Sequence, residues 1–265
     1  MLALSKGKYV GSIRNTVAAK GALVSITEYV ENQGVSPMHY HENPHLSFVL
    51  RGAMCVKRKH AITSSEEIEH FSFMRSGEMH QTSLQGDYGK NVNLELTPEF
   101  FATYGITESE IIPNHVTDHP GSALMMVRLY KEVMLMDQGL TDSIHILLLN
   151  TVRTWKEPSS KVSPSWVKNA HELLNDRWNE PVDLSQISKA TGVHPVTISK
   201  YFSRYFGATL GEYRRKLKIA KAVSMMKSSR SLTEISHECG FFDQSHFIKA
   251  FKETTAMLPA EYRRI

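Results

Sequence analysis

The sequence contains few cysteines and no long apolar run. Its 265 residues include only Cys55 and Cys239, which lie far apart, so a disulfide framework is not expected and a reducing compartment is favoured. A run of about 18 apolar residues, which a membrane span requires, does not occur. The first residues, MLALSKGKYVGS, lack the apolar segment of a secretion signal. We therefore expect a cytoplasmic protein without a membrane partner.

The charge of the chain is distributed unevenly. Hydrophobic residues make up 41% and charged residues 22%, a balance typical of globular proteins, and the length suits two domains. The segment Trp166–Ile265 contains 16 Lys and Arg against 10 Asp and Glu, whereas the other 165 residues contain 15 against 17. A basic C-terminal half next to a slightly acidic remainder favours a polyanion as its partner.

The first hundred residues have the pattern of β-strands. Ala22–Val30 and Leu46–Val56 are rich in Val, Ile, Phe and Tyr, and they are separated from other such segments by Gly, Pro and Asn. Gly52, Gly77 and Gly86 stand where tight turns are expected. This part of the chain is predicted to form a sheet.

The pattern changes to helices from about Glu99. Ser122–Gln138 is apolar on nearly all sides, and Thr141–Lys156 carries an apolar stripe with helical period. So much apolar surface predicts that one face packs on the sheet domain and another on a second chain, giving a homodimer. Glu157–Ser165, EPSSKVSPS, has the composition of a linker. The predicted division is a sheet domain at 1–120, a dimerisation segment at 121–157, a linker at 158–165 and a C-terminal domain at 166–265.

The C-terminal domain contains an internal duplication. LSQIS at 184–188 lies 48 residues before LTEIS at 232–236, and Gly192 and Gly240 follow at the same offset. Beyond the glycines the offset is 49, as these pairs show: Ile198 and Phe247, Phe202 and Phe251, Tyr213-Arg214-Arg215 and Tyr262-Arg263-Arg264. The second unit therefore carries one extra residue between its glycine and its next core position, where a turn would absorb it.

Each unit has the pattern of a helix-turn-helix. A short helix leads to a glycine, which supplies the left-handed conformation of a sharp helix exit, and a second helix follows. Asp183 with Gln186, and Ser231 with Glu234, form capping-box patterns before the apolar periodicity. One such match is weak evidence, because helical hairpins with glycine turns are common. Two in tandem on a basic segment indicate a DNA-binding domain.

Residues 166–264 resemble the AraC/XylS family of transcription regulators. The resemblance is carried by GVHPVTISKYFSRYFG and GFFDQSHFIKAFKETTAMLPAEYRR. It implies two helix-turn-helix units that bind double-stranded DNA in successive major grooves, joined by a helix over Leu210–Ser228. The chain departs from the family pattern at His194, where serine is usual, at Ala256, where glycine is usual, and at Leu210, where proline is usual. These departures affect local turns rather than the fold.

The resemblance also assigns positions that contact DNA. It implies that Val196, Ser199 and Lys200 of the first unit, and Gln244, Ser245 and Lys249 of the second, face base edges, for which their chemistry is suited. Arg204 and Lys252 are expected to bind phosphates, which position the protein without specifying sequence. The aromatic residues at helical spacing are interpreted as core and not as groups that stack on bases. Asp243 is expected to cap the second recognition helix.

The N-terminal half contains a cluster of histidines. His39-Tyr-His41-Glu-Asn-Pro-His45 and Gly77-Glu-Met-His80 resemble the two motifs of cupin barrels, with His45 in a place that usually holds glutamate. Residues 39 and 41 of one strand point to the same side. A site built of His39, His41, His45 and His80 would suit a transition metal such as Zn, Fe or Ni. The alternative is a sensor barrel that keeps this scaffold without a metal.

The predicted fold class is α+β with two domains, a cupin-like barrel followed by an all-α domain. The leading hypothesis is a regulator that senses a small molecule or a metal, forms homodimers and binds promoter DNA, with RNA polymerase as a further partner. The alternatives are a metal-dependent cupin enzyme with an adjunct DNA-binding domain, and a structural DNA-binding protein of the nucleoid type. No catalytic residue is assigned, because the N-terminal half has no paired carboxylates and no nucleophile–base pattern.

Overall fold

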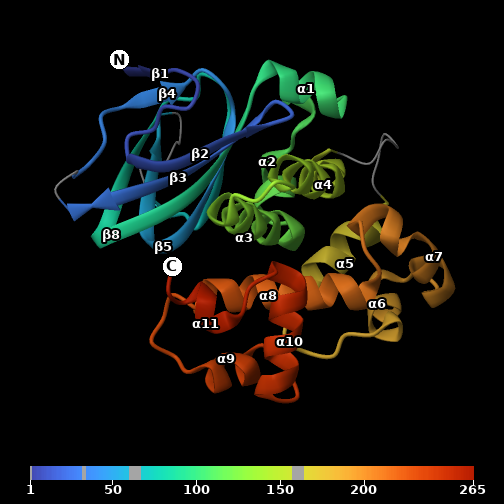
Figure 1. The fold of residues 1–265 in the computed structure, drawn as a ribbon. Helices are drawn as coiled ribbons and strands as arrows, with labels where there is room; N and C mark the ends of the chain where they lie inside the picture. Colours follow the sequence, from blue (N-terminus) through green and yellow to red (C-terminus); the bar gives the residue numbers. More distant parts are fainter. Residues whose placement is uncertain (1, 32–33, 60–66, 157–163) are drawn as a thin grey trace.

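The computed structural model describes residues 2–31, 34–59, 67–156 and 164–265 (Figure 1). A sheet domain precedes a set of helices that continues to the C-terminus. Within these residues, no helix has both the length and the hydrophobicity that crossing a bilayer requires.

The N-terminal domain is one eight-stranded sheet that curves into a half-barrel (Figure 1). The long strand β8 is its centre, because β3, β4 and β5 all pair with it in antiparallel fashion. The segment expected at 22–30 is confirmed as β3, and the one expected at 46–56 lies within β5. The strands are β1 (Leu2–Leu4), β2 (Ser12–Ala19), β3 (Ala22–Val30), β4 (His39–His41), β5 (His45–Arg58), β6 (Glu67–Ile68), β7 (Phe71–Met74) and β8 (His80–Leu96).

Two of the three expected tight turns are wrong. Gly77 lies between β7 and β8 with φ +73°, as expected. Gly52 and Gly86, however, lie inside β5 and β8, with φ +77° and +97°. The register between these strands shifts around Gly52, so the glycine serves a bulge rather than a turn. A Cβ atom at Gly52 would lie 2.4 Å from the carbonyl oxygen of Tyr88, which explains why a glycine stands there.

The helices that follow the sheet begin and end differently from the expected ones. The helix expected at 122–138 spans 120–135 and ends where Met136 takes a left-handed conformation, with φ +52°. The helix expected at 141–156 ends at residue 152 and continues as a short 3₁₀ turn, Arg153–Trp155, which buries the indole of Trp155. The helices here are α1 (Pro98–Tyr104), α2 (Pro113–Thr117), α3 (Pro120–Leu135) and α4 (Leu140–Val152), with a 3₁₀ turn at Glu108–Glu110.

The C-terminal domain is entirely helical. Most of the expected linker, 157–163, lies outside the described residues. Both expected capping boxes are confirmed, at Asp183 and Gln186 and at Ser231 and Glu234. The helices are α5 (Ser165–Asp176), α6 (Leu184–Thr191), α7 (Pro195–Phe206), α8 (Leu210–Met225), α9 (Leu232–Glu238), α10 (Gln244–Thr255) and α11 (Pro259–Tyr262).

The apolar core does not divide at the boundary between the two domains. One cluster of buried side chains runs from the sheet through α3 and α4 into α8, α9, α10 and α11, whereas α5, α6 and α7 share a separate cluster with the first half of α8. Helix α3 packs on both the sheet and the C-terminal helices (Figure 1). Its second face was expected to meet another chain, but it lies against α8 and α10 of its own chain.

Polar groups at the start of α3 and along it contact the C-terminal ends of α7 and α10. Arg128 donates to the carbonyl of Glu253 at 3.3 Å, and Lys131 donates to the carbonyl of Ala256. These carbonyls close α10, where cations are favoured by the helix dipole. At the start of α3, His119 lies 3.4 Å from the carbonyl of Phe206, the last residue of α7.

His119 makes this contact as a neutral imidazole. Its Nδ1 accepts a hydrogen bond from the backbone N–H of Gly121 at 3.1 Å and so caps α3, which leaves Nε2–H to donate to Phe206. Burial lowers the pKa of His119 to about 4, with further lowering from Lys216, His171 and His115. A proton on Nδ1 would break the cap, so the fold favours the uncharged ring.

This geometry predicts an acid-sensitive contribution to stability. The pKa of His119 is lower in the folded state than its ordinary value, so the contribution is complete above the unfolded pKa and is lost as the pH falls toward the folded value. Between about pH 7 and about pH 5, the wild type should lose about 2 kcal/mol more unfolding free energy than His119→Asn, which keeps a capping acceptor. Urea unfolding at the two pH values measures this difference. Parallel losses in the two proteins would contradict it.

Candidate nucleic-acid interface and histidine cluster

The first helix-turn-helix unit consists of α6, a turn and α7. Gly192 closes α6 in the left-handed conformation, with φ +71°. Ile198, Phe202 and Phe206 fix α7 across it, and the rings of the two phenylalanines stack with centroids 4.2 Å apart. His194 replaces the usual serine cap and works as one, because its Nδ1 accepts from the N–H of Val196 at 3.3 Å.

The opposite face of α7 carries the residues expected to face bases. Val196, Ser199 and Lys200 are all exposed and lie at positions i, i+3 and i+4 of the helix, which form one stripe. The side chain of Val196 is 67% exposed, so its methyl groups are open to a partner. Arg204 is exposed at the C-terminal end of the helix.

The second unit repeats this design in α9, its turn and α10. Gly240 is left-handed, with φ +65°, and Phe247 and Phe251 are fully buried. The carboxylate of Asp243 accepts from the N–H of His246 at 2.7 Å, which confirms the expected cap. The fully buried Ser236 donates its hydroxyl to the carbonyl of Asp243 at 2.9 Å and fixes the start of α10.

The exposed stripe of α10 is formed by Ser245, Lys249 and Lys252, at positions i, i+4 and i+7. Gln244 is half-buried at the start of the helix. The hydroxyl of Thr233 donates to its Oε1 at 2.8 Å, so the amide group is oriented with its nitrogen free to donate. Four of the expected contact residues therefore sit on α10, with three of them on one face.

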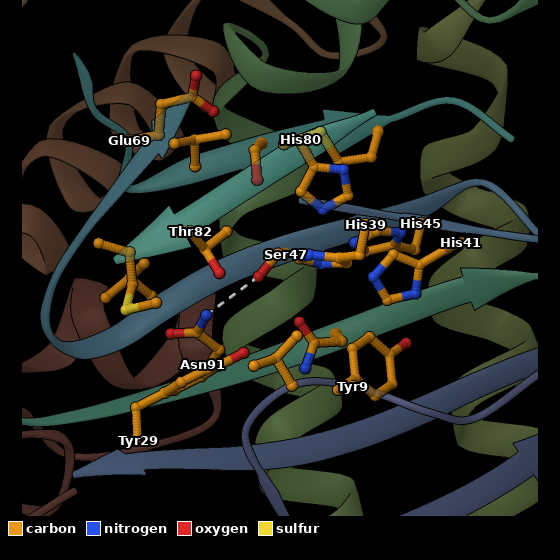
Figure 2. Close-up of a pocket in the computed structure, with 17 residues that line it drawn as sticks. Tyr9, Tyr29, His39, His41, His45, Ser47, Glu69, His80, Thr82 and Asn91 are labelled. Carbon is orange, nitrogen blue, oxygen red and sulfur yellow. Dashed lines mark hydrogen bonds between the residues drawn. The ribbon is translucent and has the colours of Figure 1, made fainter. Parts of the chain in front are cut away.

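The four expected histidines meet inside the sheet domain. His39 and His41 come from β4, and His45 and His80 are the first residues of β5 and β8. All four are buried, and ring nitrogens of His39, His41 and His80 lie within 4.8 Å of one another. The rings of His41 and His45 are 4.1 Å apart between centroids. Figure 2 shows the four rings together at one end of the cavity, with Tyr9 beside them.

Two backbone carbonyls orient this cluster. The Nδ1–H of His39 donates to the carbonyl of Pro37 at 2.8 Å, and that of His80 donates to the carbonyl of Glu78 at 2.9 Å. Because a carbonyl can only accept, each ring keeps its Nε2 lone pair for another partner. The same outer contacts orient imidazole ligands in metal sites.

Comparison with known proteins identifies the C-terminal half. A family model described as a helix-turn-helix domain matches residues 187–265. The HTH-type transcriptional regulator GbdR of Pseudomonas aeruginosa is 27% identical over 93 residues, which cover 35% of this chain and 25% of GbdR. The chain spans about a quarter to a third of the length of the first curated relatives it matches. A solved regulator with an AraC-type DNA-binding domain, from Chromobacterium violaceum, is 24% identical, with a TM-score of 0.36 and coverage of 38% of this chain and 90% of that one.

A fuller match comes from the probable transcription factor PqrA of Proteus vulgaris. It is 30% identical over 104 residues, which cover 36% of this chain and 85% of PqrA. The chain belongs to the AraC/XylS family of transcription regulators. The resemblance seen in the sequence is thus confirmed for the helix-turn-helix domain. The predicted two-domain α+β fold is confirmed by the structure itself.

The register of this AraC/XylS domain reveals a residue that sequence reasoning missed. With an offset of 49, Lys200 corresponds to Lys249, but Lys252 corresponds to Ser203 and Arg204 corresponds to Glu253. Ser203 is exposed and completes the stripe of α7 at position i+7 from Val196. The offset itself was the signal that could have found it. Arg204 and Lys252 are therefore not equivalent groups.

The four histidines lie at a small cavity, and their burial favours the neutral form of each ring. Burial is the first cause of a lowered pKa in all four rings, and it brings His41 to about 3 and His80 to about 4. The cavity has a volume of about 40 Å³, enough for an ion with a few waters but well below a drug-sized pocket of about 300 Å³. Nδ1 of His45 is buried and has no hydrogen-bond partner among the described residues.

Proposed function

We propose that this AraC/XylS chain is a sequence-specific DNA-binding regulator whose helices α7 and α10 enter two successive major grooves. The observation that carries the proposal is the pair of exposed, uncovered stripes on two capped helices whose opposite faces are buried. The N-terminal residues of recognition helices are the ones that reach base edges. In α7 and α10 these residues lie at the ends opposite to those that α3 contacts, and Val196, Ser199 and Ser245 are exposed there.

The chemistry of the two stripes suits base recognition. Lys200 and Lys249 would donate to guanine acceptors, Gln244 would donate to adenine, and serine hydroxyls would contact either base. Val196 offers an apolar contact to a thymine methyl group. Arg204 and Lys252, near the C-terminal ends of their helices, would bind phosphates and contribute affinity on any sequence.

The two kinds of contact can be separated by substitution. Lys200→Ala or Lys249→Ala should cost about 1–3 kcal/mol on the correct site and much less on random DNA, because each loses a base contact. The affected bases should form two patches about one helical turn apart. Arg204→Ala and Lys252→Ala should weaken binding on all sequences alike. Each should also flatten the salt dependence by about one unit for the lost phosphate contact.

Binding of the four variants to specific and random duplexes across a salt series measures these effects. If the two lysine variants lower both affinities equally, Lys200 and Lys249 are electrostatic anchors. The specificity would then rest on the serines, Gln244 or DNA bending. A wild type that shows no sequence preference would instead favour a structural DNA-binding protein of the nucleoid type.

The sheet domain is the sensor in this proposal, and its ligand is a metal ion or a small molecule that reaches the histidine cluster. The fit is supported by the convergent ring nitrogens, the carbonyl-held tautomers of His39 and His80, and the partnerless Nδ1 of His45. Imidazole donors suit Zn, Fe or Ni. His39, His41 and His80 would hold the ion, with His45 as a fourth ligand.

Titration with Zn, Ni or Fe(II) salts, followed by calorimetry, tests the metal directly. The wild type should bind about one ion per chain with high affinity. His39→Ala and His80→Ala should each weaken binding by more than about 100-fold, because even outer partners of ligands cost about 10–100-fold when they are lost. His237→Ala, which removes an exposed histidine of α9, is the matched control and should change nothing. A wild type that takes up no ion would identify a barrel that keeps these histidines without a metal.

A metal-dependent cupin enzyme is the second candidate, and the same histidine cluster is the observation that favours it. The cavity of about 40 Å³ leaves little room for an organic substrate beside an ion. The relatives GbdR and PqrA are named as a transcriptional regulator and a transcription factor. Both points support a regulator, and turnover of a small molecule by the full chain would support the enzyme.

The proposal includes a homodimer that is formed through helix α4. Ile146 and Leu149 of α4 lie three residues apart on one face and are 56% and 47% exposed, which is a large apolar surface for a free helix. The wild type should sediment as a dimer at tens of micromolar. Ile146→Glu and Leu149→Glu should shift it to the monomer, whereas Ile13→Glu in β2, 39% exposed, should not. A wild-type monomer with and without DNA would contradict the dimer.

A further inference from the structure

Phe242 is the most exposed large apolar side chain among the described residues. It is 89% exposed, against 67% for Val196, the next in order. A phenyl ring in water forgoes the free energy that burial would give it, about 1.5–3 kcal/mol. A turn residue with no role would more often be polar. The position of this ring on the molecule therefore calls for a physical reason.

Phe242 is the one extra residue that the second helix-turn-helix unit carries, relative to the first, between its glycine and its next core position. In the first unit Gly192 is followed by Val193, which packs against the local core, and then by the cap His194. In the second unit Phe241 takes the buried place, 7% exposed, and a further residue precedes the cap Asp243. Phe242 thus has no counterpart in the first unit, and its side chain is displaced outward.

The backbone on both sides of Phe242 is fixed. Phe241 contacts the ring of His246 and that of Phe247, each at 5.4 Å between centroids, and its N–H donates to the carbonyl of Ser236 at 3.0 Å. On the other side, Asp243 is held by the hydroxyl of Ser236 and by its own cap on α10. The exposure of Phe242 is therefore a property of a rigid turn and not of a loose loop.

We propose that Phe242 contacts the methyl group of a thymine in the half-site read by α10. The inference rests on the proposed function, because it requires α10 to lie in the major groove. The residue stands two positions before Gln244, at the helix end that approaches base edges. The thymine methyl is the apolar group of the major groove, and the neighbouring Gln244, Ser245 and Lys249 offer polar chemistry alone. On α7, the exposed Val196 presents the matching apolar contact one groove away.

The test is made with the full chain and uses uracil, which lacks the thymine methyl group. A preferred duplex is first selected from random sequences, and each thymine is then replaced by deoxyuridine, one at a time. The wild type should lose about fourfold in affinity at one thymine of the α10 half-site, the effect of one buried methyl group. Phe242→Ala and Phe242→Ser should bind the thymine and uracil duplexes equally. Their urea unfolding midpoints should match the wild type, because the ring is exposed.

Val196→Ala is the matched control, and it should keep the uracil effect that depends on Phe242. An equal loss for Phe242→Ala on thymine, uracil and random duplexes would overturn the inference, because the ring would then be a general DNA contact. Unchanged DNA binding by Phe242→Ala with loss of transcription activation would overturn it in favour of a protein partner. A wild type without specific DNA binding overturns the proposed function as well. Specific binding without a uracil effect that depends on Phe242 overturns this inference alone.

Discussion

Residues of α3 and its N-terminal cap bind carbonyl groups at the C-terminal ends of both recognition helices. The arrangement of the two domains depends on these hydrogen bonds. His119 meets the end of α7, and Arg128 and Lys131 meet the end of α10. The carbonyl groups that are bound occupy nearly equivalent places in the two units. With the offset of 49, Phe206 and Gly207 correspond to Thr255 and Ala256. From His119 to Lys131 the helix rises about 18 Å, so α3 sets the separation of two matching points. The apolar face of the same helix is buried on the sheet, which ties that spacing to the N-terminal domain.

Local signals in the sequence predicted the elements of the DNA-binding half. A capping box involves residues only three positions apart, and the glycine that ends a helix is a single residue. The duplication also tests each assignment a second time. Helices α6, α7, α9 and α10 could therefore be placed from the sequence. Strand β3 was predictable for a similar reason, because its Val- and Ile-rich run is bounded by turn residues. The histidine cluster was predictable in part. The period of two puts His39 and His41 on one side, whereas the approach of His80 depends on its pairing with His39 across strands.

Features that depend on partners distant in sequence were not predictable. The apolar surface of 122–138 correctly predicted that this helix packs against two partners. Nothing in the segment, however, distinguishes a second chain from α8 and α10 of the same chain. Gly52 and Gly86 indicated positions with a positive φ, but both a β-bulge and a turn require that conformation. Only the strand pairing distinguishes the bulge from the turn. Ala256 shows the reverse case. It adopts φ +60° without a glycine, and its carbonyl is held by Lys131.

The two recognition helices rest on different apolar cores, which limits how they can move relative to each other. Helix α10 shares its core with the sheet and α3, whereas α7 packs in a separate cluster and touches α3 through His119 at its last carbonyl. A displacement of α3 would therefore carry α10 along with it, since packed cores do not deform continuously. The same displacement acts on α7 through one 3.4 Å contact and through α8. The spacing between the N-terminal ends of α7 and α10 is thus the quantity that a displacement of α3 can alter.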